Sequence, residues 1–264
     1  MIKSKAVLDF KIYPPEAQGV GQFDGGRITE IKPIGFPQEG PAPKNLGPLF
    51  YWAWASAKGY GKIALHPHQA FEIMSYALKG EIGHYDTFEN RSRVQAGGAQ
   101  VIQAGSGISH QEETVGEFNE FFQIWFEPDL RKTIQSDPTY NEYTNEDFSI
   151  EEQAGVTIKT LIGQGSPISL ESDVEMQDVS IEKDRQLQTS LNQGKTLALV
   201  VISGKGILFD IATGVKHYID RQDFALVHAR QSGEFSIQAG SDSLLRVAMI
   251  EVPAQVDYPL YRNR

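Results

Sequence analysis

Turn-forming residues interrupt this 264-residue chain at short intervals, so that its apolar segments are only as long as strands. Glycine and proline cluster in the first fifty residues, which excludes long helices there. Between residues 63 and 126, short apolar segments alternate with Gly, Asn and Asp, and the pattern resumes from residue 156 to 252. Short strands at this spacing indicate an all-β sandwich or barrel.

The chain divides near its middle. Residues 127–148 are polar and contain Pro128 and Pro138, which predicts a connector with one short helix. The halves on either side resemble each other weakly, because residues 75–82 and 200–207 both read as a strand, a glycine turn and a second strand. We therefore predict a duplicated fold, with an N-terminal domain at residues 1–148 and a C-terminal domain at residues 149–264.

Charge and composition narrow the range of partners. The chain has 24 basic and 34 acidic residues, a net charge of −10, and no basic run longer than Arg131-Lys132. Such a field repels a phosphate backbone, so we expect no direct contact with nucleic acid, although contact with a DNA-binding protein stays open.

Three further observations concern the compartment. No segment approaches the roughly 20 apolar residues of a membrane span. The N-terminus lacks the apolar run of a secretory signal. The chain has no cysteine, which fits a reducing compartment and excludes disulfides, thiolate metal sites and cysteine nucleophiles. We therefore expect a cytoplasmic protein with no membrane contact.

Histidines and glutamates gather in two short clusters. His66 and His68 lie two residues apart and would share one face of a strand, which Glu72 also shares if the strand continues. His110 and Glu112 form a second such pair. If a barrel brings the two strands together, three imidazoles and one or two carboxylates surround one point, a set that suits a divalent Fe, Mn, Ni, Cu or Zn ion.

An H-x-H pair is by itself a weak signal, since two surface histidines give the same pattern. The other three histidines are isolated. His84 follows the glycine turn and is predicted at the surface of a hairpin. His217 and His228 have no second histidine nearby, so we predict structural roles for all three.

These residues support a family resemblance. The sequence resembles the cupin pattern at Gly61, His66, His68, Glu72 and Gly80, and again at Gly98, Gly107 and His110. More narrowly, the stretches HPHQAFEIMSYALKGEIGHYD and AGSGISHQEE are similar to the two motifs of pirins over residues 65–113. The resemblance implies two cupin barrels of the double-stranded β-helix (jelly-roll) type, packed as a bicupin, with one metal ion in the first.

The resemblance also assigns ligands. The pirin pattern places the metal on His66, His68, His110 and Glu112, whereas the general cupin pattern uses Glu72. We favour Glu112 because the pirin match is the more specific one. Glu72 then becomes a carboxylate that orients a histidine or moves a proton, or one that only bonds a neighbouring backbone group.

The chain departs from the pirin pattern at one place in its first half, and its second half has no counterpart of the H-x-H pair. Residues 97–101 read GGAQV where pirins have Gly-Asp-x-Gln-Trp. In the second half, Ser190 and Asn192 align roughly with His66 and His68, so we expect that barrel to lack a metal.

Activity follows from the same resemblance. It implies an Fe(II)-type dioxygenase that opens quercetin or a related enol-bearing aromatic with O₂, with Glu112 or Glu72 as the base. The alternatives are an iron-dependent redox-sensing regulator that binds a partner protein, and a metal-dependent isomerase or storage protein. Apolar residues near the site are either a substrate pocket or plain core; they are Met74, Tyr76 and Phe122.

Overall fold

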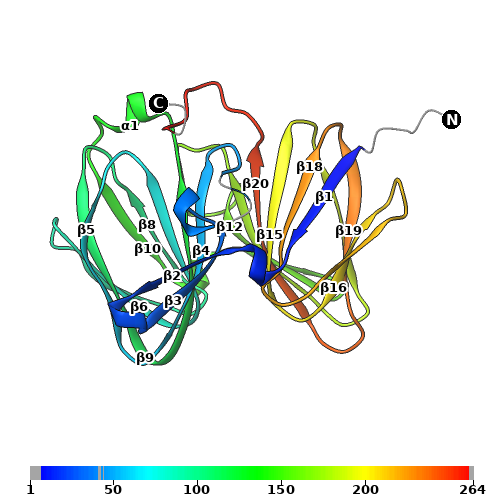
Figure 1. Cartoon of the computed structure of the whole chain (residues 1–264), viewed down its shortest axis with the longest axis horizontal. Helices are drawn as coiled ribbons and strands as arrows, with labels where there is room; N and C mark the ends of the chain where they lie inside the picture. The colour runs from blue at the N-terminus through cyan, green and yellow to red at the C-terminus, as the bar shows by residue number, and fades with distance from the viewer. Residues whose placement is uncertain (1–6, 41–42, 44, 262–264) are drawn as a thin grey trace. The chain divides into compact units, whose positions relative to one another are not determined.

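The computed structural model describes residues 7–40, 43 and 45–261. Their regular structure is almost entirely β, which confirms the all-β prediction (Figure 1). The strands are β1 (Leu8–Tyr13), β2 (Gly19–Phe23), β3 (Ile28–Ile34), β4 (Leu49–Lys58), β5 (Gly61–His68), β6 (Glu72–Asp86), β7 (Arg91–Gln95), β8 (Ala99–Gln103), β9 (Ile108–Phe126), β10 (Thr139–Tyr143), β11 (Ile150–Gln153), β12 (Val156–Ile162), β13 (Glu175–Ile181), β14 (Gln186–Leu191), β15 (Lys195–Ser203), β16 (Gly206–Asp210), β17 (Lys216–Ile219), β18 (Phe224–Ala229), β19 (Gly233–Ala239) and β20 (Leu245–Pro253).

Among the described residues, helical structure is confined to single turns. They are α1 (Leu130–Thr133) and the 3₁₀ turns Pro15–Ala17, Asp24–Gly26, Pro37–Glu39 and Asn145–Asp147. The described part of the chain therefore contains no helix with the length and apolar character of a membrane span.

The strands form two compact units. The first unit comprises the described residues of 17–148, 167–173 and 256–261, and the second comprises residues 7–16, 149–166 and 174–255. The N-terminal strand β1 belongs to the second unit, where it pairs with β18 (Figure 1). The predicted domain boundary between residues 148 and 149 stays a prediction. Residues 7–16, before this boundary, belong to the second unit, and residues 167–173 and 256–261, after it, belong to the first.

The first unit is one antiparallel sheet in the order β10-β8-β6-β9-β4-β3-β2, with β5 added on β9 and β7 on β6. Its central strands are long: β6 has 15 residues and β9 has 19, so the prediction of short strands is wrong here. The predicted turn at Gly80 is instead a bulge within β6, where the register shifts between Ala77 and Lys79 and again between Lys79 and Glu81, and Gly80 has a φ of +78°. A side chain at this position would collide with Asn119 on β9.

The polar segment predicted as a connector contains the one short helix that was expected, α1. It also contains β10, which the composition did not reveal and which pairs with β8 along the edge of the sheet. An edge strand exposes much of its surface, so it needs no run of apolar residues to mark it. This strand carries Tyr140 to the inside of the first unit, where it packs on Ile73, Ile102 and their neighbours.

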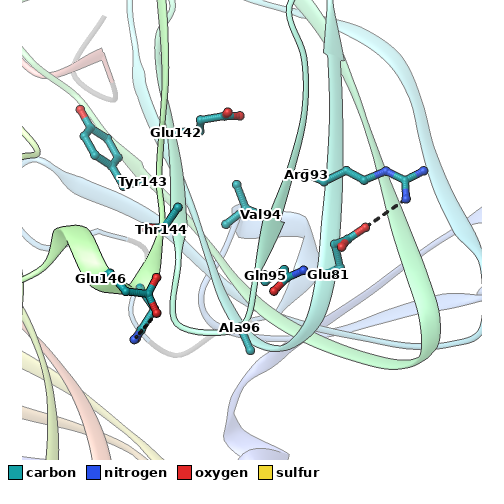
Figure 2. A pocket seen from close by; sticks show the side chains of 10 residues that line it. Glu81, Arg93, Val94, Gln95, Ala96, Glu142, Tyr143, Thr144 and Glu146 are labelled. Atoms are coloured by element: carbon teal, nitrogen blue, oxygen red, sulfur yellow. Dashed lines mark hydrogen bonds and ion pairs between the residues drawn. The ribbon is translucent and has the colours of Figure 1, made fainter.

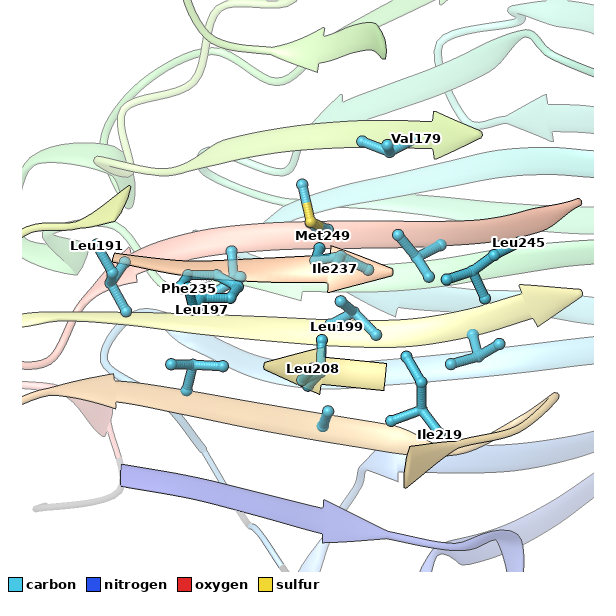
Figure 3. Close-up of a cluster of buried hydrophobic side chains, with 14 of the residues drawn as sticks. Val179, Leu191, Leu197, Leu199, Leu208, Ile219, Phe235, Ile237, Leu245 and Met249 are labelled. Carbon is cyan, nitrogen blue, oxygen red and sulfur yellow. The ribbon is translucent and has the colours of Figure 1, made fainter. Parts of the chain in front are cut away.

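The second unit consists of a seven-stranded sheet, β1-β18-β15-β20-β13-β12-β11, and a four-stranded sheet, β14-β19-β16-β17. Its core is a single apolar cluster with strands of both sheets around it (Figure 3). Members that are fully buried include Leu199, Val201, Leu208, Phe235, Ile237, Leu245 and Val247. Close packing of apolar side chains therefore fills the interior of the second unit.

Candidate metal centre

Two neighbouring strands deliver three histidines to one point inside the first unit. His66 and His68 alternate along β5, and His110 lies directly opposite His66 on β9. The ring centroids are 4.5 Å apart for His66 and His110, 4.8 Å for His66 and His68, and 5.0 Å for His68 and His110. The predicted convergence of the two strands is therefore what the structure shows.

The free nitrogen atoms of this triad fit a metal ion. One nitrogen from each ring lies within 4.8 Å of the other two. The Nδ1 of His66 bonds the carbonyl oxygen of Ala64 at 2.8 Å and must donate to it, which leaves Nε2 as a lone pair. The Nε2 of His68 and both nitrogens of His110 are buried and have no hydrogen-bond partner among the described residues. Buried polar atoms without partners are costly, and a bound cation would satisfy these.

Burial also keeps two members of the triad, His68 and His110, in their ligand form. Burial, reinforced by the neighbouring imidazoles, lowers the pKa of His68 to about 3. The same causes lower the pKa of His110 to about 3. Both rings are therefore neutral at pH 7, and neutral imidazole is the form that binds metal.

Glu112 lies beside the triad in a network of neutral donors. One of its oxygens accepts hydrogen bonds from Ser75 Oγ at 2.7 Å and Gln100 Nε2 at 3.0 Å, and the other accepts from Gln123 Nε2 at 2.8 Å. A carboxylate has about four lone-pair directions, so one direction remains. Its oxygens are not among the atoms that meet within 4.8 Å, and its role as the fourth ligand stays a prediction.

The Glu72 carboxylate bonds groups that do not belong to the network around Glu112. Its carboxylate accepts hydrogen bonds from the backbone amides of Glu171 and Ser172, at 2.6 and 3.0 Å, and from Gln103 Nε2 at 3.0 Å. The sequence left two roles open for Glu72, and these contacts match the one in which it bonds backbone groups. The strand β5 ends at His68 and the backbone turns at Ala70, which has a φ of +67°, so the alternation of the H-x-H strand does not extend to Glu72. Its role as a base stays a prediction.

The surface position predicted for His84 is wrong. Its side chain is buried, bonds Asp86 at 2.9 Å and stacks on Tyr140 with ring centroids 4.0 Å apart. The bulge at Gly80 continues β6 past the expected turn and places His84 opposite Glu112. The other two histidines have structural contacts: His217 stacks on Phe10, and His228 bonds Thr196.

Sequence reasoning also missed the polar neighbours of Glu112. Ser75 and Gln123 are buried and face the site, and Gln100 joins them from β8. Since side chains alternate along a strand, Met74 and Tyr76 point to the opposite face from Ser75. The residues suggested as a pocket lining are fully buried; they are Met74, Tyr76 and Phe122.

In the second unit, the two residues that the sequence aligned with the H-x-H pair face solvent and not the interior. Ser190 and Asn192, aligned with the H-x-H pair, are exposed, and Leu191 between them is 1% exposed and part of the apolar core. The rough alignment was therefore displaced by one residue with respect to the inward face.

A hollow of about 280 Å³ opens elsewhere on the first unit (Figure 2). Glu81, Glu142 and Glu146 line it, and its one arginine, Arg93, is paired with Glu81 at 3.2 Å. No histidine of the triad contributes to it. We therefore assign no ligand to this hollow.

Comparison with known proteins agrees with this geometry. The family model of pirin matches residues 55–126, which include all three histidines. The chain is 32% identical over 168 residues to a putative quercetin 2,3-dioxygenase of Pseudomonas aeruginosa, covering 62% of this chain and 70% of that protein. It is 29% identical over 146 residues to Pirin-like protein 2 of Arabidopsis thaliana, covering 53% and 45%. The chain spans about half the length of the plant relatives that it matches first.

Among solved structures, a bacterial pirin from Escherichia coli in complex with nickel(II) superposes with a TM-score of 0.76 at 22% identity, covering 94% of this chain and 100% of that one. This likeness shows the fold. It confirms the prediction of a bicupin, in which one chain contains two cupin barrels.

Proposed function

The chain belongs to the pirin family, and on that premise we propose that it is a metal-dependent dioxygenase that opens quercetin, or a related enol-bearing aromatic, with O₂. The observation that carries the proposal is the histidine triad, whose buried nitrogens have no hydrogen-bond partner among the described residues. Relatives named as quercetin 2,3-dioxygenases support the choice of reaction.

The triad would hold one divalent ion. We propose Fe(II), with Mn, Ni, Cu and Zn as alternatives that imidazole ligands also accept. When bound, a redox-active ion such as Fe(II) would supply the redox chemistry that protein side chains lack. The contribution of the chain is to present three imidazoles in a fixed arrangement: the Ala64 carbonyl orients the ring of His66, and burial keeps His68 and His110 neutral.

Glu112 is the better candidate for the residue that handles the substrate proton. A flavonol binds and oxidises more readily after its enol hydroxyl loses its proton, which requires a carboxylate within reach. Glu112 has one lone-pair direction left beside the triad, for use either as a ligand or as the base. Glu72 is bonded to two backbone amides and a glutamine, and we assign it to second place.

Aerobic turnover of quercetin tests the proposal. Iron-loaded protein is expected to remove the flavonol absorbance and to consume O₂ with it. A His66→Ala/His68→Ala variant should lose this activity, whereas His217→Ala, a matched change in the second unit, should retain it. If the wild type consumes flavonol no faster than the double variant, the proposal fails. Regulation through a partner protein then becomes the leading prediction from the sequence.

A further inference from the structure

A buried histidine–aspartate pair lies next to the triad and has no part in the function proposed above. His84 Nε2 and Asp86 Oδ2 are 2.9 Å apart, and neither side chain is exposed to solvent. Asp86 also accepts hydrogen bonds from the backbone amides of Phe88 and Asn90 and from the side chain of Asn90. A carboxylate surrounded by donors accepts from His84 as well, so the proton of this imidazole lies on Nε2.

The other nitrogen of His84 is therefore an acceptor without a partner. Its Nδ1 is buried and has no hydrogen bond among the described residues, as is also true of both nitrogens of His110. The two rings are neighbours, with centroids 5.5 Å apart and planes tilted by 40°. Register explains the proximity, because Asp86 on β6 lies directly opposite His110 on β9.

Tyr140 holds the His84 ring in this place. Its ring stacks on the imidazole at 4.0 Å with an angle of 9° between the planes. The hydroxyl of Tyr140 is anchored by Ser92 and Gln100. Stacking on one face and the bond to Asp86 leave Nδ1 as the only ring atom of His84 that still needs a hydrogen-bond partner.

A metal-bound His110 would supply the hydrogen-bond donor that His84 Nδ1 lacks. Only one of its two nitrogens can bind the ion, and the other then carries a proton that needs an acceptor in a buried place. Ligating histidines regularly donate this proton to a neighbouring group that fixes the ring. The unpartnered Nδ1 of His84 is such an acceptor, and a chain from Asp86 through His84 to His110 would leave none of these nitrogens unsatisfied.

We propose that His84 is a positioning residue for the metal centre: it accepts the N–H of metal-bound His110 while its own Nε2–H stays bonded to Asp86. The inference rests on the metal site proposed above, but not on the substrate. It predicts that the charge of Asp86 strengthens His110 as a ligand and fixes the orientation of its ring.

Cobalt(II) is a suitable probe, because its affinity can be measured by competition with a chelator and its visible absorption reports the ligand arrangement. His84→Phe keeps a flat ring on Tyr140 but removes both nitrogens. We expect it to weaken Co(II) binding by about 10- to 100-fold and to shift the absorption bands. His84→Asn, which places an amide near the former Nδ1, should recover part of the affinity. The matched control is His217→Phe, a stacked histidine of the second unit, which should leave both readouts unchanged.

A second variant keeps the imidazole and reverses its proton. In Asp86→Asn, the remaining carbonyl oxygen can still accept from the backbone amides, while the new NH₂ faces His84 Nε2 and drives the proton to Nδ1. His84 then cannot accept from His110, so the same loss of affinity is expected even if His84→Phe does not fold.

The outcomes separate the two proposals. If wild-type protein binds no Co(II), the metal site itself is wrong. If wild type binds Co(II) and either folded variant, His84→Phe or Asp86→Asn, binds it within twofold of wild type with an unchanged spectrum, the role of His84 is wrong. Failure to open quercetin affects neither result.

Discussion

The two units of this chain have antiparallel β architecture in common but fill their interiors differently. The interior of the first unit holds His68, His84, His110 and Glu112, together with the polar groups that bond Glu112. The interior of the second is apolar, from Leu191 on β14 to Val247 on β20. The inward positions of one kind of scaffold can therefore carry either apolar side chains or metal ligands. Apolar packing stabilises the fold more than ligand side chains do.

The cost of the polar interior is visible in single atoms. Both nitrogens of His110 are buried without a hydrogen-bond partner among the described residues. In the second unit, inward side chains such as Phe235 and Leu199 have no polar atoms to satisfy and are fully buried. Four experiments test this difference between the two interiors, from the largest expected effect to the smallest.

The largest effect is expected from the apolar interior. Phe235→Ala removes a fully buried ring from the core of the second unit. It should lower the free energy of unfolding by about 3–5 kcal/mol, measured by urea denaturation. Phe88→Ala, at a residue that is 56% exposed, is the control and should change stability by less than about 0.5 kcal/mol. Equal losses for the two variants would contradict the importance of packing.

Acid should weaken the metal-free protein through the polar interior. His68 and His110 have pKa values of about 3 when folded, against 6.5 as the ordinary value. Between these values the unfolded chain binds more protons, so stability is full above pH 6.5 and falls as the pH drops toward 3. Two such groups give a slope of up to about 2.7 kcal/mol per pH unit. Urea titrations at pH 7, 6 and 5 measure it, and His110→Leu should halve the contribution.

Converting one ligand to an apolar residue should make the first unit resemble the second. His110→Leu removes two buried nitrogens that lack partners, at similar volume. In metal-free protein, it should raise the free energy of unfolding by about 1–3 kcal/mol. A clear loss of stability would mean that the histidine is satisfied in some other way.

The smallest effect is expected from a group one step away from the triad. Gln123→Leu removes the donor that bonds one oxygen of Glu112 at 2.8 Å. Metal affinity should fall by about tenfold, the lower end of the range for such neighbours. Gln188→Leu is a matched control, because it removes an exposed Gln–Glu bond of 3.1 Å in the second unit. Equal affinity of the two variants would show that Glu112 does not act on the ion.

The sequence predicted the part of this site that depends on local alternation. His66 and His68 share a face because they are two residues apart on one strand, and the expectation of a barrel brought the strand of His110 to them. Alternation could not be extended to Glu72, because the backbone at Ala70 turns before the next strand begins. It also could not reveal His84, since Gly80 looks like a turn but forms a bulge that continues β6.

The sequence also could not predict strands that lack an apolar pattern. β10 lies at a sheet edge and has mostly exposed or half-buried residues, so its sequence has no apolar pattern. Only the tertiary pairing with β8 shows that Tyr140 reaches the His84 ring. The buried polar set of Ser75, Gln100 and Gln123 was hidden for the same reason, because hydrogen bonds between strands distant in sequence leave no local signature.

Metal analysis of His110→Leu beside wild type tests the central claim most directly. The proteins would be purified without a chelator or an affinity tag, and the metal content of folded chains measured by mass spectrometry. We predict close to one ion per wild-type chain and none in the variant, whose fold should be at least as stable as that of metal-free wild type. Equal metal content in the two proteins, or none in either after incubation with Fe(II), would contradict the assignment of this interior as a metal centre.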